Sequence, residues 1–282
     1  MNPESTSIEG LQQWVGRTEQ TSDEITRVPA AALAATLDRD DAPRQKGDPL
    51  PLLWHWLYFV PLHRQSELAS DGHVKRGSFL PPIELPRRMW AGGRFEFHRP
   101  LRIGDAVRRT SRIQEVSSKQ GRSGPLLFVV VRHEIMADGQ IALTEEQDIV
   151  YRDYSSAASP PPQAPLGQAW QRTIHPDDVL LFRYSALTFN GHRIHYDRRY
   201  ATEVEGYPGL VVHGPLIATL LMDQLRRNFP EANVRRFAFR AISPLFDTGS
   251  FFVCGQPDGD TIRLWAKNET GGLAMDATAS TA

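Results

Sequence analysis

The stretch HGPLIATLLMDQLRRN, residues 213–228, carries the strongest helix signal of the chain. Apolar residues at helical spacing mark one face of it, namely Ile217, Leu220, Leu221 and Leu225. Pro215 stands in the first turn, where its missing N–H costs nothing. Arg226 and Arg227 stand in the last turn, where positive charge suits the helix dipole. We therefore expect one long, buried helix over these residues.

Strand signals follow this helix directly. The segment VRRFAFRAISPLFDTGSFFVCGQ (234–256) predicts a strand, a loop that contains Pro244, and a second strand. Another pair of strands is expected to turn at 257–260, which has the sequence PDGD. A long helix followed by four strands predicts an antiparallel meander wrapped around that helix.

The first half of the chain shows the same plan. The segment GRFEFHRPLRIGDAVRRTSRIQEV (93–116) predicts two strands joined by a short loop with Gly104 and Asp105. Residues 126–152 predict a strand pair around the turn signal Asp138-Gly139. Two similar units in one chain indicate a duplication.

The cores of the two units align as FEFHRPLRIGDAV (95–107) and FAFRAISPLFDTGSF (237–251). Between the units lies SSAASPPPQAP (155–165), whose consecutive prolines favour an extended linker and can continue neither a helix nor a central strand. We therefore predict an N-terminal domain over residues 1–160 and a C-terminal domain over residues 161–282.

The longest apolar run is LPLLWHWLYFV at 50–60, which contains His55. It has about half of the roughly 20 residues that a membrane-spanning helix needs. We interpret it as a buried helix with aromatic anchors, and as the counterpart in the first half of the helix at 213–228.

Composition and charge exclude several classes of function. The 282 residues have a formal net charge of −1, so no overall field attracts nucleic acid or a membrane surface. The single cysteine, Cys254, excludes an internal disulfide and a zinc site built from cysteines. The N-terminus is acidic and amphipathic and is not typical of a signal or transit peptide. We expect a cytoplasmic protein.

The candidate chemistry lies in FRYSALTFNGHRIHYD, residues 182–197. Polar side chains follow an apolar and aromatic run here, namely Asn190, His192, Arg193, His195 and Asp197. A histidine exchanges protons near neutral pH and is a natural general acid and base. HRIHYD also offers metal ligands, but three ligands so close together on one loop are a weak signal, and we predict no metal.

The chain resembles the MaoC-like acyl-CoA hydratases and dehydratases, and within them the branch with two hot dogs in one chain that includes itaconyl-CoA and mesaconyl-CoA hydratases. The most specific segments are FRYSALTFNGHRIHYDRRYA (182–201) and PGLVVHGPLIATLL (208–221). Further matching segments are WVGRTEQTSDEIT (14–26), PLLWHWLYFVP (51–61) and GSFLPPIELPRRMWAGG (77–93).

This resemblance implies an α+β tandem hot-dog fold, in which each half is an antiparallel sheet wrapped around a central helix. The N-terminal half is expected to be degenerate and to bind substrate or CoA. The family's catalytic loop reads roughly Gly-Asp-x-Asn-Pro-x-His. Its histidine falls on His195 and its aspartate on Asn190, while its Asn and Pro become His192 and Arg193. This chain therefore keeps the family's histidine base and lacks its catalytic carboxylate.

The implied reaction adds water to an α,β-unsaturated thioester. We expect His195 to take a proton from water and return it to the α-carbon on the same face, while Asn190 holds the water. The backbone N–H of Gly214, at the start of the central helix, is expected to stabilise the oxyanion, because free N–H groups point outward there.

Substrate contacts are expected from residues around this loop. Arg193 is the first choice for a substrate carboxylate, since a guanidinium pairs bidentately with carboxylate or phosphate. The alternatives for the arginines here are the CoA phosphates or a solvated rim. The other predicted substrate-binding residues are His192, His213, Tyr184 and Arg183. For Asp197 we favour a cap of the following turn over a role in orienting His195.

The leading hypothesis is a hydro-lyase that acts on a short, branched dicarboxylic enoyl-CoA of the itaconyl or mesaconyl kind. The alternatives are a 3-hydroxyacyl-thioester dehydratase of fatty acyl chains, a hot-dog thioesterase, and a non-catalytic acyl-CoA binder. The resemblance implies that an acyl-CoA is the substrate, that no cofactor is needed and that two such chains form a homodimer. Neither nucleic acid nor a membrane is expected as a partner.

Overall fold

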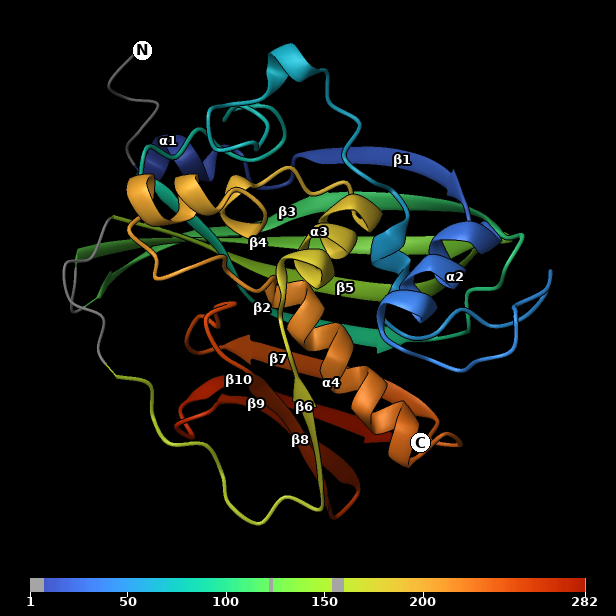
Figure 1. The fold of residues 1–282 in the computed structure, drawn as a ribbon. Helices are drawn as coiled ribbons and strands as arrows, with labels where there is room; N and C mark the ends of the chain where they lie inside the picture. The colour runs from blue at the N-terminus through green and yellow to red at the C-terminus, as the bar shows by residue number, and fades with distance from the viewer. Residues whose placement is uncertain (1–7, 122–123, 154–159, 282) are drawn as a thin grey trace.

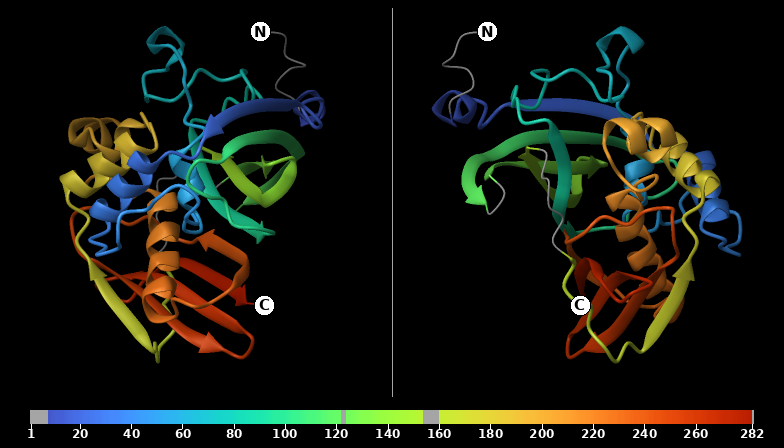
Figure 2. Two further views of the ribbon diagram at one scale, coloured as in Figure 1. Left: turned by 90° about the vertical axis from the view of Figure 1, so that its right-hand side faces the viewer. Right: turned by 60° about the vertical axis from the view of Figure 1, so that its left-hand side comes forward.

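A computed structural model describes residues 8–121, 124–153 and 160–281 of the chain. The strands form a single 10-stranded sheet in the order β1-β3-β4-β5-β2-β7-β10-β9-β8-β6. The helices α2 (Arg27–Thr36), α3 (Asp178–Leu187) and α4 (Gly214–Asn228) lie on one side of it (Figures 1 and 2).

Each half contributes the same arrangement of five strands. The first half supplies β1 (Thr18–Glu24), β2 (Arg87–Phe97), β3 (Ala106–Gly121), β4 (Gly124–Ala137) and β5 (Gln140–Arg152). The second half supplies β6 (Trp170–Ile174), β7 (Val234–Ala241), β8 (Phe251–Asp258), β9 (Thr261–Asn268) and β10 (Leu273–Thr281). The predicted strands are therefore confirmed. The meander is incomplete, because β8, β9 and β10 pair in succession while β7 pairs with β10. In the first half β2 pairs with β5 in the same way.

The two halves join through the antiparallel pair β2 and β7, in which Phe95 faces Phe237. The rings of these two residues lie 5.9 Å apart, and Phe239 stacks on Phe95 at 6.2 Å. The contact buries two edge strands that would otherwise be open to other chains. The halves thus complete each other within one chain, as a tandem hot dog requires.

Helix α4 (Gly214–Asn228) is the long helix predicted from the sequence. It packs against β6, β8, β9 and β10 (Figure 1), and every residue from Leu216 to Leu225 is buried. The shorter helices are α1 (Ile8–Gln12), α2 (Arg27–Thr36) and α3 (Asp178–Leu187). The described residues also form short 3-10 turns at Trp54–Leu57, Gln65–Glu67 and Arg193–His195. One turn of π-helix lies at Tyr200–Val204.

The prediction of a helix at 50–60 is wrong. Only Trp54–Leu57 forms a 3-10 turn. Leu53 and Phe59 have φ values of 67° and 55°, in the left-handed region, which a continuing right-handed helix does not allow. The prediction of burial holds, because the aromatic residues of the turn and its flanks enter the core. α4 therefore has no helical counterpart of its length in the described part of the first half.

The linker predicted at 155–165 falls partly outside the described residues, which resume at residue 160. From there the chain runs along the turn between β9 and β10, where the backbone N–H of Leu273 donates to the carbonyl of Pro162 at 2.8 Å. The domain boundary predicted at 160/161 stays a prediction. None of the helices in the described ranges combines the length and apolar character needed to cross a membrane.

Candidate active site

The loop from Asn190 to Asp197 follows helix α3 and returns towards α4. Its central part is the 3-10 turn Arg193–His195. One carboxylate oxygen of Asp197 accepts a hydrogen bond from the backbone N–H of Tyr200 at 3.0 Å. Asp197 therefore caps the following turn, as predicted, and fixes the end of the loop.

His195 is held in one orientation and one tautomer. Its Nδ1 lies 2.7 Å from the carbonyl oxygen of Val211. A carbonyl only accepts hydrogen bonds, so Nδ1 carries the proton and Nε2 keeps a free lone pair. Burial of the ring lowers the pKa of His195 to about 4. The imidazole is therefore a neutral base at neutral pH.

His213, the residue before α4, packs against one face of the His195 ring. The two rings are stacked, with centroids 3.8 Å apart and planes inclined by 17°. Nε2 of His213 is hydrogen-bonded to Oγ of Ser185 at 2.8 Å, while its buried Nδ1 has no hydrogen-bond partner among the described residues. The ring of Tyr184 packs edge-on against His213 at 5.1 Å, and its hydroxyl is hydrogen-bonded to Thr219. Tyr184, predicted to bind substrate, is thus a buried packing partner of His213.

The N-terminus of α4 lies beside the stacked histidines. Gly214 is its first residue, and the N–H groups of a first turn have no acceptor within the helix. A Cβ built on Gly214 would meet the backbone oxygen of Trp90 at 3.9 Å. Trp90 belongs to β2, so this helix end faces the first half of the chain. The candidate site is therefore formed where the two halves meet.

A loop of the first half, residues 68–74, packs directly on the loop 190–197, which matches the family's catalytic loop. The backbone N–H of Arg193 donates to the carbonyl of Asp71 at 2.9 Å. Gly72 has a φ of +88°, and a Cβ on it would lie 1.8 Å from the carbonyl oxygen of Gly191. The two backbones touch at a point where only glycine fits.

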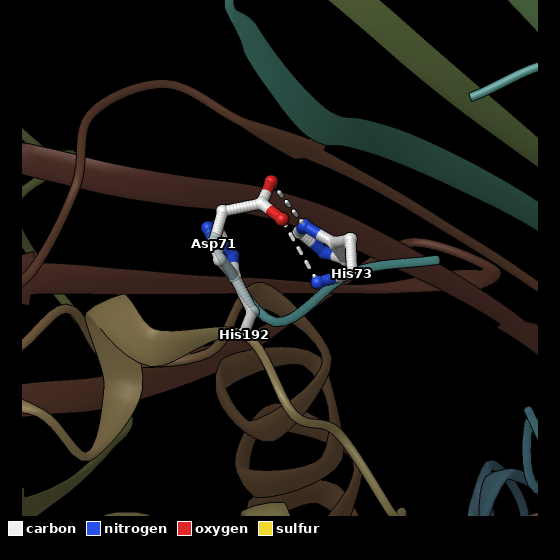
Figure 3. Close-up of side chains that lie close together, drawn as sticks. All are labelled: Asp71, His73 and His192. Atoms are coloured by element: carbon white, nitrogen blue, oxygen red, sulfur yellow. Dashed lines mark hydrogen bonds and ion pairs between the residues drawn. The ribbon is translucent and has the colours of Figure 1, made fainter. Parts of the chain in front are cut away.

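This contact brings two unpredicted residues, Asp71 and His73, to the site. The ring of His73 lies 4.0 Å from that of His192, which in turn lies 5.4 Å from that of His195. Figure 3 shows Asp71 hydrogen-bonded to His73 next to His192. In the sequence only the turn signal Asp71-Gly72 beside a histidine marks this segment. Nothing local indicates that it approaches residues 190–197.

Asp71, His73 and His192 offer ligand atoms that all lie within 4.8 Å of one another, a donor set that suits a divalent transition metal. Burial and the positive charges of Arg88 and Arg76 lower the pKa of His73, against the effect of Asp71. The same positive charges oppose a bound cation. Burial raises the pKa of Asp71, but the hydrogen bonds from His73 outweigh it, so Asp71 stays ionised.

Asn190 shapes the catalytic loop. Its Oδ1 accepts from the backbone N–H of His192 at 3.0 Å, and its own N–H donates to the carbonyl of Ser185 at 2.8 Å. The side-chain NH₂ remains available as a donor. The predicted contact between Asn190 and the reacting water stays a prediction.

The two arginines predicted to bind substrate, Arg193 and Arg183, have other surroundings in the structure. The guanidinium of Arg193 donates to Asp197 at 2.7 and 3.0 Å and to the carbonyl of Ser70 at 3.0 Å, and it lies over the ring of Tyr200. These contacts do not favour a bond from Arg193 to a substrate carboxylate. Arg183 is exposed on the face of α3 opposite the buried residues, so it does not join the cluster.

A cavity of about 320 Å³ lies at the opposite end of α4. Trp54, Met222 and Phe229 are among its lining residues, and none of the predicted site residues is. The polar cluster at the first turn of α4 is therefore a separate feature of the molecule.

Comparisons with known proteins agree with this arrangement. A family profile described as hydroxyacyl-thioester dehydratase type 2 matches residues 53–247. The chain is 51% identical over 268 residues to the mesaconyl-C(4)-CoA hydratase of Chloroflexus aurantiacus, covering 94% of this chain and 95% of that protein. It is 31% identical over 244 residues to the mitochondrial hydroxyacyl-thioester dehydratase type 2 of Schizosaccharomyces pombe, covering 75% and 78%.

Solved structures share the fold at low sequence identity. A MaoC-like dehydratase superimposes with a TM-score of 0.70 at 17% identity, over 98% of this chain and 99% of that chain. A Mycobacterium tuberculosis protein with a double hot-dog fold superimposes with a TM-score of 0.62 at 13% identity, over 97% of both chains. These structures confirm the tandem hot-dog architecture.

Proposed function

The chain belongs to the hydroxyacyl-thioester dehydratase type 2 family of MaoC-like enzymes, and from this membership we propose that it hydrates a methyl-branched dicarboxylic enoyl-CoA. It is a hydro-lyase, and its substrate would be of the mesaconyl-CoA or itaconyl-CoA kind. The product would be a hydroxyacyl-CoA of the citramalyl type. The 51% identity to a mesaconyl-C(4)-CoA hydratase supports this substrate class over fatty acyl chains.

One observation carries the proposal. The neutral imidazole of His195, with Nδ1 bonded to the carbonyl of Val211, stacks on the residue that precedes the N-terminus of α4. A base and an oxyanion-stabilising helix end therefore stand side by side. Hydration of an unsaturated thioester uses both groups.

In the reaction, Nε2 of His195 takes a proton from water as the oxygen adds to the β-carbon. Negative charge develops on the thioester oxygen, where the N–H of Gly214 and the helix dipole stabilise it. The protonated His195 then delivers its proton to the α-carbon on the same face. A buried imidazole is a stronger acid than an exposed one, which favours this last transfer.

The proposed reaction needs no cofactor, since the coenzyme A thioester is itself the substrate and acid–base chemistry is sufficient for hydration. The homodimer and the cytoplasmic location expected from the sequence are predictions of the same kind. Light scattering of the purified protein and fractionation of cells would test them.

An absorbance assay over a panel of enoyl-CoAs tests the proposal. We expect the purified chain to consume the conjugated double bond of mesaconyl-CoA with a higher kcat/KM than that of crotonyl-CoA. The assay should include 3-methylcrotonyl-CoA, which has a methyl group in place of the carboxylate.

Other outcomes identify the alternatives. Equal kcat/KM values for mesaconyl-CoA and crotonyl-CoA would favour a dehydratase of fatty acyl chains. Release of free thiol, followed with a thiol reagent, would indicate a thioesterase. Tight binding of acyl-CoA without a change in enoyl absorbance would indicate a non-catalytic binder.

A further inference from the structure

Arg88 lies on β2 at the edge of the candidate site. Its cross-strand partner is Tyr151 on β5, and the hydroxyl of Tyr151 is hydrogen-bonded to it. Residues two apart on a strand share a face, so Arg88 points to the same side as Trp90. The backbone oxygen of Trp90 is the atom nearest to a Cβ built on Gly214. Arg88 therefore stands about 6.6 Å along the strand from the point where β2 meets the first turn of α4.

The side chain of Arg88 is half-buried, and among the described residues no carboxylate forms an ion pair with it. The neighbouring arginines differ. Arg87 forms an ion pair with Glu205, and Arg76 donates to backbone carbonyls, including that of Pro86 at 2.9 Å. A half-buried guanidinium without a carboxylate partner is a candidate for binding an anion.

The surroundings of Arg88 also suit an anion. A second guanidinium, that of Arg76, lies with Arg88 close to the hydroxyl of Tyr151. Asp71 is the negative group of this cluster, and its carboxylate is already hydrogen-bonded to His73. The two positive charges of Arg88 and Arg76 exceed the single negative charge of Asp71, so one positive charge among these groups has no counter-charge.

We propose that Arg88 binds the distal carboxylate of the acyl group and so selects dicarboxylic over neutral enoyl-CoA substrates. This inference rests on the proposed hydratase function and names a specificity residue for it. It replaces Arg193, which already uses three of its N–H groups in bonds to Asp197 and to the carbonyl of Ser70.

The chemistry of these groups suits the substrate. In an enoyl-CoA of the mesaconyl-C(4) type, the β-carbon that water attacks also carries the carboxylate. If the thioester oxygen lies at Gly214 and the β-carbon at His195, the carboxylate is expected on the side of β2, the strand that meets Gly214 and carries Arg88. A planar guanidinium would receive it with two parallel hydrogen bonds.

The test compares the wild type with Arg88→Met on mesaconyl-CoA and on the neutral 3-methylcrotonyl-CoA. We expect kcat/KM for mesaconyl-CoA to fall about 10²-fold, the loss typical of two charge-assisted hydrogen bonds. The value for 3-methylcrotonyl-CoA should change less than threefold. Arg88→Lys should fall in between, because it keeps the charge and loses the fork. Arg94→Met, an exposed arginine on the same strand, is the matched control and should behave as the wild type.

Binding of unreactive analogues separates this inference from the proposed function. By calorimetry, the wild type should bind succinyl-CoA more tightly than butyryl-CoA, and Arg88→Met should abolish the difference. A wild type that prefers mesaconyl-CoA while Arg88→Met weakens both substrates equally would overturn the inference alone, and would place Arg88 on the CoA moiety. A wild type that binds succinyl-CoA through Arg88 but hydrates no enoyl-CoA would overturn the proposed function alone.

Discussion

At the scale of single residues, the proposed chemistry of this site depends on how one imidazole is held. The carbonyl of Val211 fixes the tautomer of His195, and the ring of His213 fixes its plane. Burial keeps the ring neutral. A histidine at the same place in an exposed loop would be partly protonated near neutral pH and free to rotate.

The first prediction concerns His195 and pH. In the proposed mechanism the basic form of His195 is the active one, so kcat/KM should fall as pH drops through the pKa of His195 in the free enzyme. Because burial lowers that pKa to about 4, activity should persist well below pH 6.5 and decline towards pH 4. A pH profile of mesaconyl-CoA hydration measures this. His195→Ala should lower kcat at least 10²-fold at neutral pH.

The exposed His63 provides the control, because His63→Ala should leave both the rate and the profile unchanged. An acid limb near pH 6.5 would assign the base to a different, more exposed group. A rate close to that of the wild type in His195→Ala would remove this residue from the mechanism.

At the scale of elements, two loops from different halves build the site together. The catalytic loop follows α3, and residues 68–74 come from the long connection between α2 and β2. They meet backbone to backbone at Gly72 and Gly191. The position of His192 therefore depends on a segment that carries no part of the family's catalytic motif.

The second prediction concerns this contact. Gly72→Ala would put a methyl group 1.8 Å from the carbonyl oxygen of Gly191, so the two loops must separate. We expect kcat/KM for mesaconyl-CoA to fall at least tenfold while the far-ultraviolet circular dichroism stays that of the wild type.

Gly47 is a matched control, since it has a φ of +90° and a Cβ on it would meet nothing within 4 Å. Gly47→Ala and Gly72→Ala should share the strain of a left-handed alanine, about 1–2 kcal/mol of stability. Equal activity in the two variants would show that the contact between the loops does not position the site.

At the scale of the whole molecule, the two halves share one continuous sheet but differ in what packs against it. The second half is organised around α4, whereas the described part of the first half has no long helix in the matching place. The first half buries a carboxylate on β5, that of Glu145, which is hydrogen-bonded to His55, Trp56 and Gln147 at 2.7 to 3.0 Å. Because these hydrogen bonds satisfy the carboxylate, burying Glu145 destabilises the fold less than burying an unpaired charge would.

The third prediction is that the folded protein loses stability in acid from about pH 6.5 downward. Burial lowers the pKa values of His133 and His195 to about 4, so between pH 6.5 and 4 the unfolded chain binds protons that the folded chain does not. The free energy of unfolding should fall by about 1.3 kcal/mol for each of these histidines between pH 7.5 and 5.5. The lowered pKa values of Asp41 and Glu145 extend the loss towards pH 2.

Urea denaturation at the two pH values measures this change. His133→Gln removes one of the titrating groups and should make the fall in the free energy of unfolding between the two pH values smaller by about 1.3 kcal/mol. A free energy of unfolding that is the same at pH 7.5 and 5.5 would mean that both rings are protonated in the folded protein.

Much of the fold follows from local patterns in the chain. The period of apolar residues and the position of Pro215 are sufficient to predict α4, and turn residues such as Asp138-Gly139 are sufficient for the hairpins. His195 was predicted because its motif is contiguous. These features depend on neighbours in the sequence, whose steric and hydrogen-bonding preferences act over a few residues.

Long-range packing accounts for the rest. The segment at 50–60 is apolar enough for a helix, but it is folded into a single turn where it meets the core. Arg193 is the better candidate by sequence, yet it forms an ion pair with Asp197. Arg88 lies on a strand of the other half and has no carboxylate partner among the described residues. Which charged side chain stays free for a ligand depends on contacts between residues far apart in the chain. Those contacts exist only once the two halves have joined along β2 and β7.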